Sequence, residues 1–294
     1  MSLKKNPISF LIGTDPELLL MKGRKTLPAR RYCFNNDDEL GSDGNGVTWE
    51  LRPEPDKNPL VVVNRMRDIM VRKITTKNIL WDGEWHSGSY TNGFPLGGHI
   101  HFGIKENIIK PSILADILDN YLGAITLLIE NKQQGYRRRS AGYGFMGDYR
   151  KPPHGLEYRT PSSYLTSPYV FSAILCLAKT IAFEAINNRQ FSFNSYVHGY
   201  DFTYMQTETI LKNFPLIWDD ITKMILYQKY KLYIDVIYFL VTNKLSWFPT
   251  SSFKQSWGLV KFDNWSQNKM KLNTIWARYT QSLGEIQTRK TRNT

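Results

Sequence analysis

The sequence predicts an α+β protein built on a mostly antiparallel sheet. Three observations indicate this class: strand-like runs come first along the chain, helix-like runs lie between and after them, and a hairpin turn joins two of the strands. The turn is the run Asp-Gly-Asn-Gly at residues 43–46, which favours a tight connection between antiparallel strands. With 294 residues the chain is long enough to bury a large core.

Short strands and a helix alternate along the first hundred residues. Residues 8–20 predict a strand that is interrupted at Gly-Thr-Asp-Pro, and Pro16 indicates a sheet edge or a bulge because proline cannot donate to the ladder. Residues 47–51 predict the strand that follows the hairpin turn, and residues 60–74 predict a helix. Residues 81–94 predict a loop or ragged strand, and residues 97–103 a short strand flanked by glycines.

Helices dominate the rest of the chain. Apolar residues recur with helical period over 111–128, residues 133–153 predict a long basic loop, and residues 156–160 predict a strand. Ser167 and Pro168 predict the start of an apolar helix through residue 186, which Lys179 and Glu184 mark as a core helix and not a membrane span. Residues 202–245 predict helices. We expect a catalytic domain over residues 1–245 and a basic, tryptophan-containing extension over residues 246–294.

The composition is that of an ordered globular protein, with 41% hydrophobic and 22% charged residues. Cys33 and Cys176 match no metal or disulfide spacing, and residues 1–7 lack the apolar core of a signal peptide, so we expect a cytoplasmic protein. The formal charge of +12 favours an anionic substrate such as a nucleotide, contact with nucleic acid, or simple solubility. No nucleic-acid recognition motif occurs, so we do not expect nucleic acid as a partner. We expect no membrane partner either, because Lys179 and Glu184 interrupt the most apolar helix.

Three polar pairs stand in strand-like runs, and each pair is separated by one residue. Residues i and i+2 of a strand point to the same face, so each pair would place two polar groups where a core normally has valine or leucine. A fourth acid lies in the strand after the hairpin. The set comprises Asp15 and Glu17, His99 and His101, Glu157 and Arg159, and Glu50. Together these side chains suit divalent cations and phosphate better than packing.

Each pair also has a structural interpretation. Asp15 and Glu17 could be a solvated strand end, Glu50 could simply pair with Arg52, and Glu157 could form an exposed salt bridge with Arg159. The two histidines between glycines are harder to explain as packing. The preceding basic loop could be solvated, or it could close over nucleotide phosphates through basic residues that lie among glycines. Its candidates for nucleotide or substrate contact are Arg137, Arg139, Arg150 and Lys151.

Taken in order, these segments resemble the glutamine synthetase/glutamate–cysteine ligase superfamily, and more closely its phage-encoded type 2 amidoligases. The shared elements are an acid-x-Glu strand, a glutamate after an Asp-Gly hairpin, a Gly-x-His-x-His strand, and a Glu-aromatic-Arg strand followed by Pro-Ser. They span roughly residues 10–165. Asp15 stands where the superfamily usually has glutamate, with Pro16 after it.

The resemblance implies a curved antiparallel sheet whose concave face holds ATP and two or three Mg²⁺ or Mn²⁺ ions. It implies that Glu17 and Glu50 serve one metal site, and that Asp15, His99 and Glu157 serve another. Arg159 would stabilise the transferring phosphoryl group. His101 is a candidate for the general base, and the host cytoplasm is the expected compartment of a phage-encoded enzyme.

The leading functional hypothesis is an ATP-dependent ligase that joins a small-molecule or peptide carboxylate to an amine. A guanidino kinase-like phosphotransferase uses related sheets and remains open. So do a metal-dependent hydrolase that uses His99 and His101, and an inactive relative retained as a binding module. The identity of the carboxylate and amine and the oligomeric state are not readable from the sequence.

Overall fold

Most of the described strands form two antiparallel sheets that meet along one stretch of chain, residues 12–22. The computed structural model describes residues 7–33, 39–247 and 253–261. The first sheet has the order β1-β9-β11-β10, and the second has the order β3-β2-β5-β4 with β6 also paired to β2. The strands of the first sheet are β1 (Ile12–Thr14), β9 (Ile100–Phe102), β11 (Leu156–Tyr158) and β10 (Tyr149–Arg150). Those of the second are β2 (Glu17–Lys22), β3 (Lys25–Thr26), β4 (Leu40–Ser42), β5 (Trp49–Leu51) and β6 (Glu84–His86).

The two sheets are joined at Asp15 and Pro16, where the first strand breaks as the sequence predicts. The Glu17 amide donates to the Gly97 carbonyl at 2.9 Å, on the side of the first sheet. The Leu51 amide donates to the Pro16 carbonyl at 3.3 Å, on the side of the second sheet. The short chain between β1 and β2 is therefore bonded to both sheets, and it brings their polar faces together.

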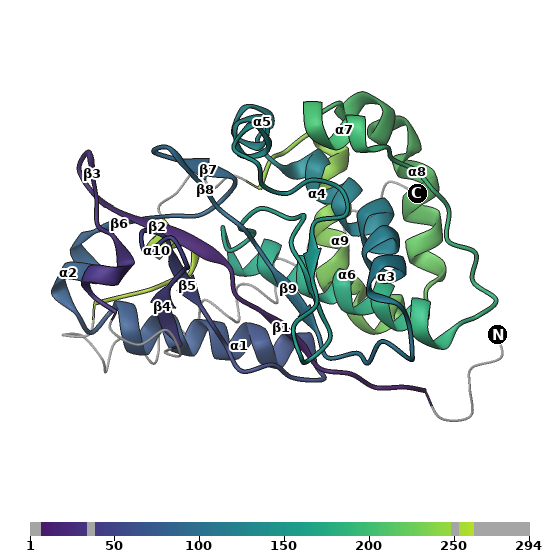
Figure 1. The fold of residues 1–294 in the computed structure, drawn as a ribbon, viewed down its shortest axis with the longest axis horizontal. Coiled ribbons are helices and arrows are strands. Elements are labelled where there is room, and N and C mark those ends of the chain that lie inside the picture. Colours follow the sequence, from purple (N-terminus) through teal and green to yellow (C-terminus); the bar gives the residue numbers. More distant parts are fainter. Residues whose placement is uncertain (1–6, 34–38, 248–252, 262–294) are drawn as a thin grey trace, which may run out of the picture.

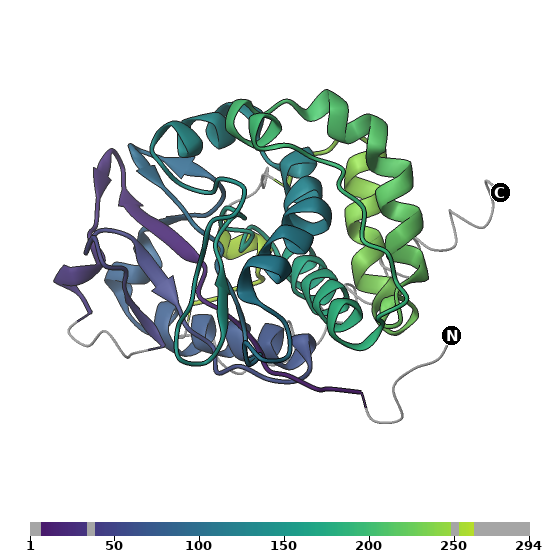
Figure 2. The ribbon, with the colours of Figure 1, turned by 45° about the vertical axis from the view of Figure 1, so that its right-hand side comes forward.

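Helices pack beside and below the sheets, and most of them gather on the side away from β2 and β5 (Figures 1 and 2). The long apolar α6 packs against α9, α1 and α3. The helical elements of the first part are η1 (Ala29–Arg31), α1 (Pro59–Ile69), the π-helical η2 (Met70–Ile74), α2 (Asn78–Asp82), α3 (Pro111–Leu118), the π-helical η3 (Asp119–Gly123), α4 (Ala124–Ile129) and α5 (Lys132–Ser140). Those of the second are α6 (Pro168–Asn187), α7 (Gly199–Tyr204), α8 (Thr207–Lys223), α9 (Tyr227–Thr242) and α10 (Phe253–Ser256). A small hairpin pairs β7 (Tyr90–Thr91) with β8 (Phe94–Pro95).

Two stretches, Pro111–Ile129 and Pro168–Asn187, are long and apolar enough to cross a membrane when only length and composition are considered. Most residues of both are buried inside the protein, as in core helices. Ser167 caps α6 by accepting a hydrogen bond from the Val170 amide at 3.3 Å, and Pro168 occupies its first turn. The predicted core helix is confirmed.

The α+β class, the antiparallel sheets and the helical C-terminal part are confirmed. The basic segment 133–153 is not a loop throughout, because residues 132–140 form α5, whose first turn is capped by the Asn131 side chain. Its later part does hold the short strand β10. Trp247, Phe253 and Trp257 are buried in the core, while residues 262–294 lie outside the described part. The domain boundary at residue 245 stays a prediction.

The core around α6 gives a first testable expectation. Leu175 is fully buried on α6, so Leu175→Ala leaves a cavity and should lower the free energy of unfolding by about 2–5 kcal/mol. Denaturant unfolding followed by circular dichroism measures this loss. The matched control is Leu211→Ala on α8, where the leucine is 44% exposed and the change should stay within about 0.5 kcal/mol. Equal losses in both variants would contradict the assignment of α6 to the core.

Candidate active site

A polar pocket of about 690 Å³ lies where the two sheets meet. Acidic side chains, one imidazole and four arginines dominate its walls. The lining residues are Asp15, Glu17, Arg30, Ser42, Asp43, Gly44, Asn45, Gly46, Glu50, Arg52, His99, Tyr143, Arg150, Glu157 and Arg159. Five of the predicted metal ligands are among them, so the pocket is the candidate active site.

Strand register explains how residues far apart in sequence share this pocket. In the second sheet Glu17 stands directly opposite Glu50, so their side chains lie on one face. In the first sheet Glu157 stands between His101 on β9 and Arg150 on β10, again on one face. Opposed acids are destabilising in an ordinary sheet, which indicates that the Glu17–Glu50 pair serves something other than sheet stability.

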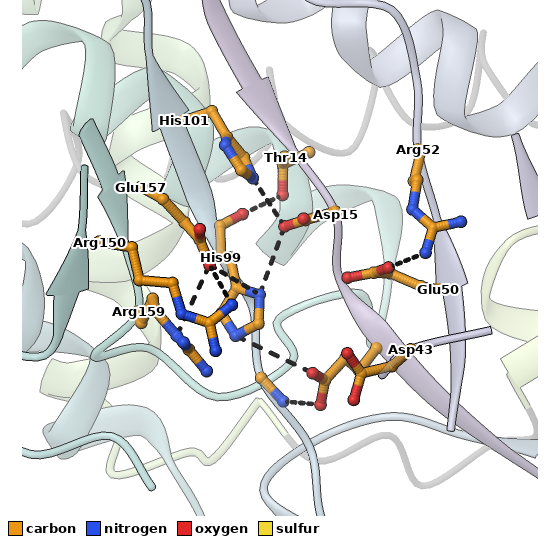
Figure 3. Close-up of polar contacts among 12 residues, drawn as sticks. Thr14, Asp15, Asp43, Glu50, Arg52, His99, His101, Arg150, Glu157 and Arg159 are labelled. Carbon is orange, nitrogen blue, oxygen red and sulfur yellow. Dashed lines mark hydrogen bonds and ion pairs between the residues drawn. The ribbon is translucent and has the colours of Figure 1, made fainter. Parts of the chain in front are cut away.

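His99 is the centre of the pocket (Figure 3). Its Nδ1 lies 3.4 Å from Asp15 Oδ1 and 3.8 Å from Glu157 Oε1, and its Nε2 lies 3.9 Å from Glu17 Oε1. The ring is almost fully buried, and among the described residues no group hydrogen-bonds its Nε2. A Cβ on Gly97 would stand 2.4 Å from this Nε2, so a glycine is needed there for the ring to adopt its position.

Two sets of candidate metal ligands lie side by side. Asp15, Glu50 and His99 form one set, and Glu17, Asp43 and Glu50 form the other, with the ligand atoms of each set within 4.8 Å of one another. Glu17 and Glu50 fall in the same set, and their service of one metal site stays a prediction. Glu50 belongs to both sets, and Glu157 reaches the first through His99. Carboxylates with one imidazole suit Mg²⁺ or Mn²⁺, and the unpartnered, buried His99 Nε2 fits a ligand role.

Burial and neighbouring charges together shift the pKa values of these groups. Burial raises the pKa of Glu50 to about 8, helped by the charges of Asp15 and Glu17 and opposed by Arg52. Burial also raises the pKa of Glu17. Burial disfavours the charge on His99, yet Asp15 and Glu17 outweigh it and raise its pKa to about 9. For Asp15, burial is overcome by hydrogen bonds from His101 and His99, so its pKa lies below the usual range.

Arginines flank the acids on two sides. Arg159 Nε lies 3.6 Å from Glu157 Oε1, and the mostly exposed Arg150 reaches the same oxygen at 3.8 Å. On the opposite side Arg52 pairs with Glu50 and donates to the Ser42 carbonyl at 3.0 Å (Figure 3). The expected Glu50–Arg52 partnership is therefore present, and it forms part of the pocket.

The other predicted contact residues lie elsewhere. Arg137 is exposed on α5, and Lys151 is exposed and lies 3.5 Å from Glu106. Arg139 is buried and pairs with Glu130 at 3.0 Å. None of the three lines the polar pocket. Arg137 and Arg139 belong to α5, whereas Lys151 directly follows β10. The prediction that Arg139 contacts a nucleotide is wrong for this pocket, since its guanidinium is paired inside the fold.

His101 faces a second cavity of about 350 Å³, on the other side of Asp15. Its Nε2 lies 3.0 Å from Asp15 Oδ1, and its Nδ1 lies 2.9 Å from His154 Nε2. Burial and the neighbouring His101 lower the pKa of His154.

The pocket residues that were not predicted include Arg30, Asp43, Tyr143 and Arg52 in its active-site role. The only available signal was for Asp43, an acid in the Asp-Gly-Asn-Gly turn directly before Glu50, and a turn gives an acid there a structural role already. Arg30 approaches Gly46 across the fold, a contact that no local pattern indicates.

A buried arginine holds the Arg159 side of the pocket. Arg138 donates to the carbonyls of Thr160 at 2.8 Å, Arg159 at 3.2 Å and Pro161 at 3.0 Å. Asp119 adds a second support, since its carboxylate accepts from the Tyr158 hydroxyl at 2.6 Å and from the Thr160 hydroxyl at 2.9 Å. The segment after β11 is thereby fixed to α5 and η3.

Comparison with known proteins identifies the family. A profile of the family described as Phage phiEco32-like COOH.NH2 ligase-type 2 matches residues 12–259. The chain belongs to this family. It is a carboxylate–amine ligase, and the predicted resemblance is confirmed. The match covers both sheets and the helical part.

Other comparisons are more distant. A sequence search among curated proteins finds no significant match. Among solved structures, one similar chain comes from the complex between the prokaryotic ubiquitin-like protein Pup and its ligase PafA, with a TM-score of 0.48, 8% identity, and coverage of 81% of this chain and 67% of that one. Another is a bifunctional glutathione synthetase from Pasteurella multocida, with a TM-score of 0.44, 12% identity, and coverage of 85% and 49%. The ligase thus spans about half of the latter chain, and neither likeness establishes a relationship by itself.

The support from Arg138 can be tested directly. Arg138→Lys keeps the charge but cannot reach three carbonyls, and each buried carbonyl left unsatisfied costs roughly 1–3 kcal/mol. We expect a loss of at least about 2 kcal/mol in the free energy of unfolding. The control is Arg137→Lys, the same change at the exposed neighbour. An Arg138→Lys protein as stable as this control would show that the three hydrogen bonds do not hold the segment.

Proposed function

We propose that the chain uses ATP to join a carboxylate to an amine through an acyl phosphate. The observation that carries this proposal is the pair of adjoining ligand sets that share Glu50, flanked by arginines on both sides. Two neighbouring cation sites with nearby guanidinium groups suit the several negative charges of a transferring phosphoryl group.

The chemistry explains why such a site is needed. A carboxylate does not condense with an amine in water, because its oxygen is a poor leaving group. In the first step a carboxylate oxygen attacks the γ-phosphorus of ATP, the bond to the bridging oxygen breaks, and ADP leaves. In the second step the amine nitrogen attacks the acyl carbon and the carbon–oxygen bond to phosphate breaks. The phosphate leaves with the bonding pair and can take the proton lost by nitrogen, which balances the reaction.

The polar pocket supplies the groups for the first step. Asp15, Glu50 and His99 would hold one divalent cation, Glu17, Asp43 and Glu50 a second, and Glu157 borders the first set through His99. When bound, these ions supply positive charge that neutralises the phosphate oxygens and lowers the barrier to phosphoryl transfer. Arg159 and Arg150 stand on one wall and Arg52 and Arg30 on the other, so both walls can contact anionic oxygens.

His101 has a different position from the other catalytic candidates. It does not line the polar pocket, but it contacts Asp15 from the neighbouring cavity at 3.0 Å. It therefore lies beside the metal ligands on the side from which a second substrate can approach. A role beside the amine fits this position better than a role on the nucleotide.

Metal binding is the first property to measure. Glu50→Gln keeps the shape of the protonated acid but removes a ligand from both sets, so Mn²⁺ affinity should fall about 100-fold or more. Electron paramagnetic resonance of free Mn²⁺ measures this without any need for activity. Glu208→Gln, an exposed glutamate on α8, is the control and should bind Mn²⁺ as the native protein does. Equal affinity in both variants would remove Glu50 from the metal site.

Turnover tests the reaction itself. The protein with ATP, Mg²⁺ and a pool of amino acids, polyamines and cell-wall peptides should release ADP and form products one water lighter than the summed reactants. His99→Ala and Glu157→Ala should lower ADP release by about 10²–10³-fold. Mass spectrometry identifies the product. A phosphorylated product without condensation would instead indicate a phosphotransferase, and hydrolysis without nucleotide would indicate a hydrolase. Absence of ATP binding would refute the ATP dependence.

A further inference from the structure

We propose that the second cavity, which adjoins the metal pocket through Asp15 and Arg52, binds the amine substrate and selects amines with an apolar body. This inference rests on the proposed function and names the substrate class of its second half-reaction. The cavity of about 350 Å³ lies at the lower end of the size range for small-molecule sites. It has room for an aliphatic side chain and its amine.

Position supports the assignment. A ligase of this kind must bring two substrates to one reacting carbon from different directions, since the phosphate occupies one side. Asp15 and Arg52 border both spaces, so a group in the second cavity lies next to the polar pocket. Figure 3 shows Asp15 between His99 on the metal side and His101 on the other. A molecule held in the second cavity therefore faces the metal pocket across a single carboxylate.

Charge favours an amine over a carboxylate. The groups that face the cavity beside His101 and His154 include the carboxylate of Asp15, which attracts an ammonium group and repels an acid. Arg52 also borders the cavity, but its guanidinium is paired with Glu50 and with the Ser42 carbonyl. The Thr14 hydroxyl is likewise engaged, with the His99 carbonyl at 2.7 Å and the Tyr164 hydroxyl at 2.6 Å. Among the residues that line this cavity, Asp15 is the one with an acidic side chain.

The remaining walls are apolar. Leu11, Pro53 and Pro55 contribute side chains without hydrogen-bonding groups, and Gly13 and Gly103 leave space between them. A Cβ on Gly13 would stand 3.2 Å from Pro55 Cβ, so a larger residue there would narrow the cavity. Leu11 is 43% exposed, so its side chain is accessible to a ligand in the cavity. None of these side chains can pair with a second charged group on the ligand, which favours an amine whose remaining part is neutral and apolar.

The test measures amine binding directly and needs no turnover. Calorimetric titrations would compare glycinamide, alaninamide and leucinamide, which share the amine and differ only in apolar size. We expect leucinamide to bind about tenfold or more tightly than glycinamide. Leu11→Trp, which fills the cavity, should abolish this preference, and Leu11→Ala should weaken leucinamide binding several-fold. The control is Leu211→Trp, an exposed leucine on α8, which should bind all three probes as the native protein does.

Other outcomes overturn the proposal in distinct ways. N-acetyl-leucine has the same body with a carboxylate and no amine. If N-acetyl-leucine binds where leucinamide does not, and if Leu11→Trp abolishes this binding, the cavity binds the carboxylate substrate and the proposal is wrong. Equal binding of the three amides, or no saturable binding of any, also overturns it. Mn²⁺ binding in the Leu11 variants confirms that the metal pocket is intact. Leucinamide binding in the absence of any ATP turnover would refute the proposed reaction but would still support the assignment of the cavity to the amine.

Discussion

Pro16 has no amide hydrogen to donate, so the first strand stops at Thr14 and resumes at Glu17 in a different sheet. Every feature of the site depends on this break. Asp15 sits within it and contacts His101 of β9 and His99 directly before β9, while Glu17 opens the strand that faces Glu50. A continuous strand would send alternate side chains to opposite faces of a single sheet. The break instead lets two sheets present their acids to one space.

That concentration of charge has to be balanced inside the fold. Asp15, Glu17 and Glu50 lie close together at low exposure, and repulsion between buried carboxylates is strong. His99 offsets part of it from the centre, and Arg52 and Arg159 do so from the walls. An arrangement of this kind lowers stability unless a cation completes it, so the site is a place where function outweighs packing.

Much of this could be predicted from the sequence because the chemistry is local to short strands. The spacing of two residues singled out Asp15, Glu17 and His99, which do share the pocket, although His101 faces the neighbouring cavity. The break at Pro16 was visible as a proline inside a strand pattern. The contributions of Arg30 and Asp43 were not predictable, since they depend on how a turn folds over the sheet. For Arg139 a local pattern was present but led to the wrong prediction. A basic run beside glycines resembles a phosphate-binding loop, but this part of the chain forms a helix and buries the Arg139 side chain against Glu130. The pairing of His101 with His154 joins residues 53 apart and needs the fold itself.

The three hydrogen bonds from Arg138 have a further consequence. They fix the carbonyls of residues 159–161 from inside the protein, and so they hold the backbone that carries Arg159 before any ligand arrives. The conformational entropy of ordering this wall is lost once, during folding, and not again at each encounter with substrate. Arg150, by contrast, is mostly exposed and keeps its rotamer freedom. The backbone under Arg159 is thus ordered before substrate binds, whereas the cost of ordering a side chain on binding falls on Arg150 of the same wall.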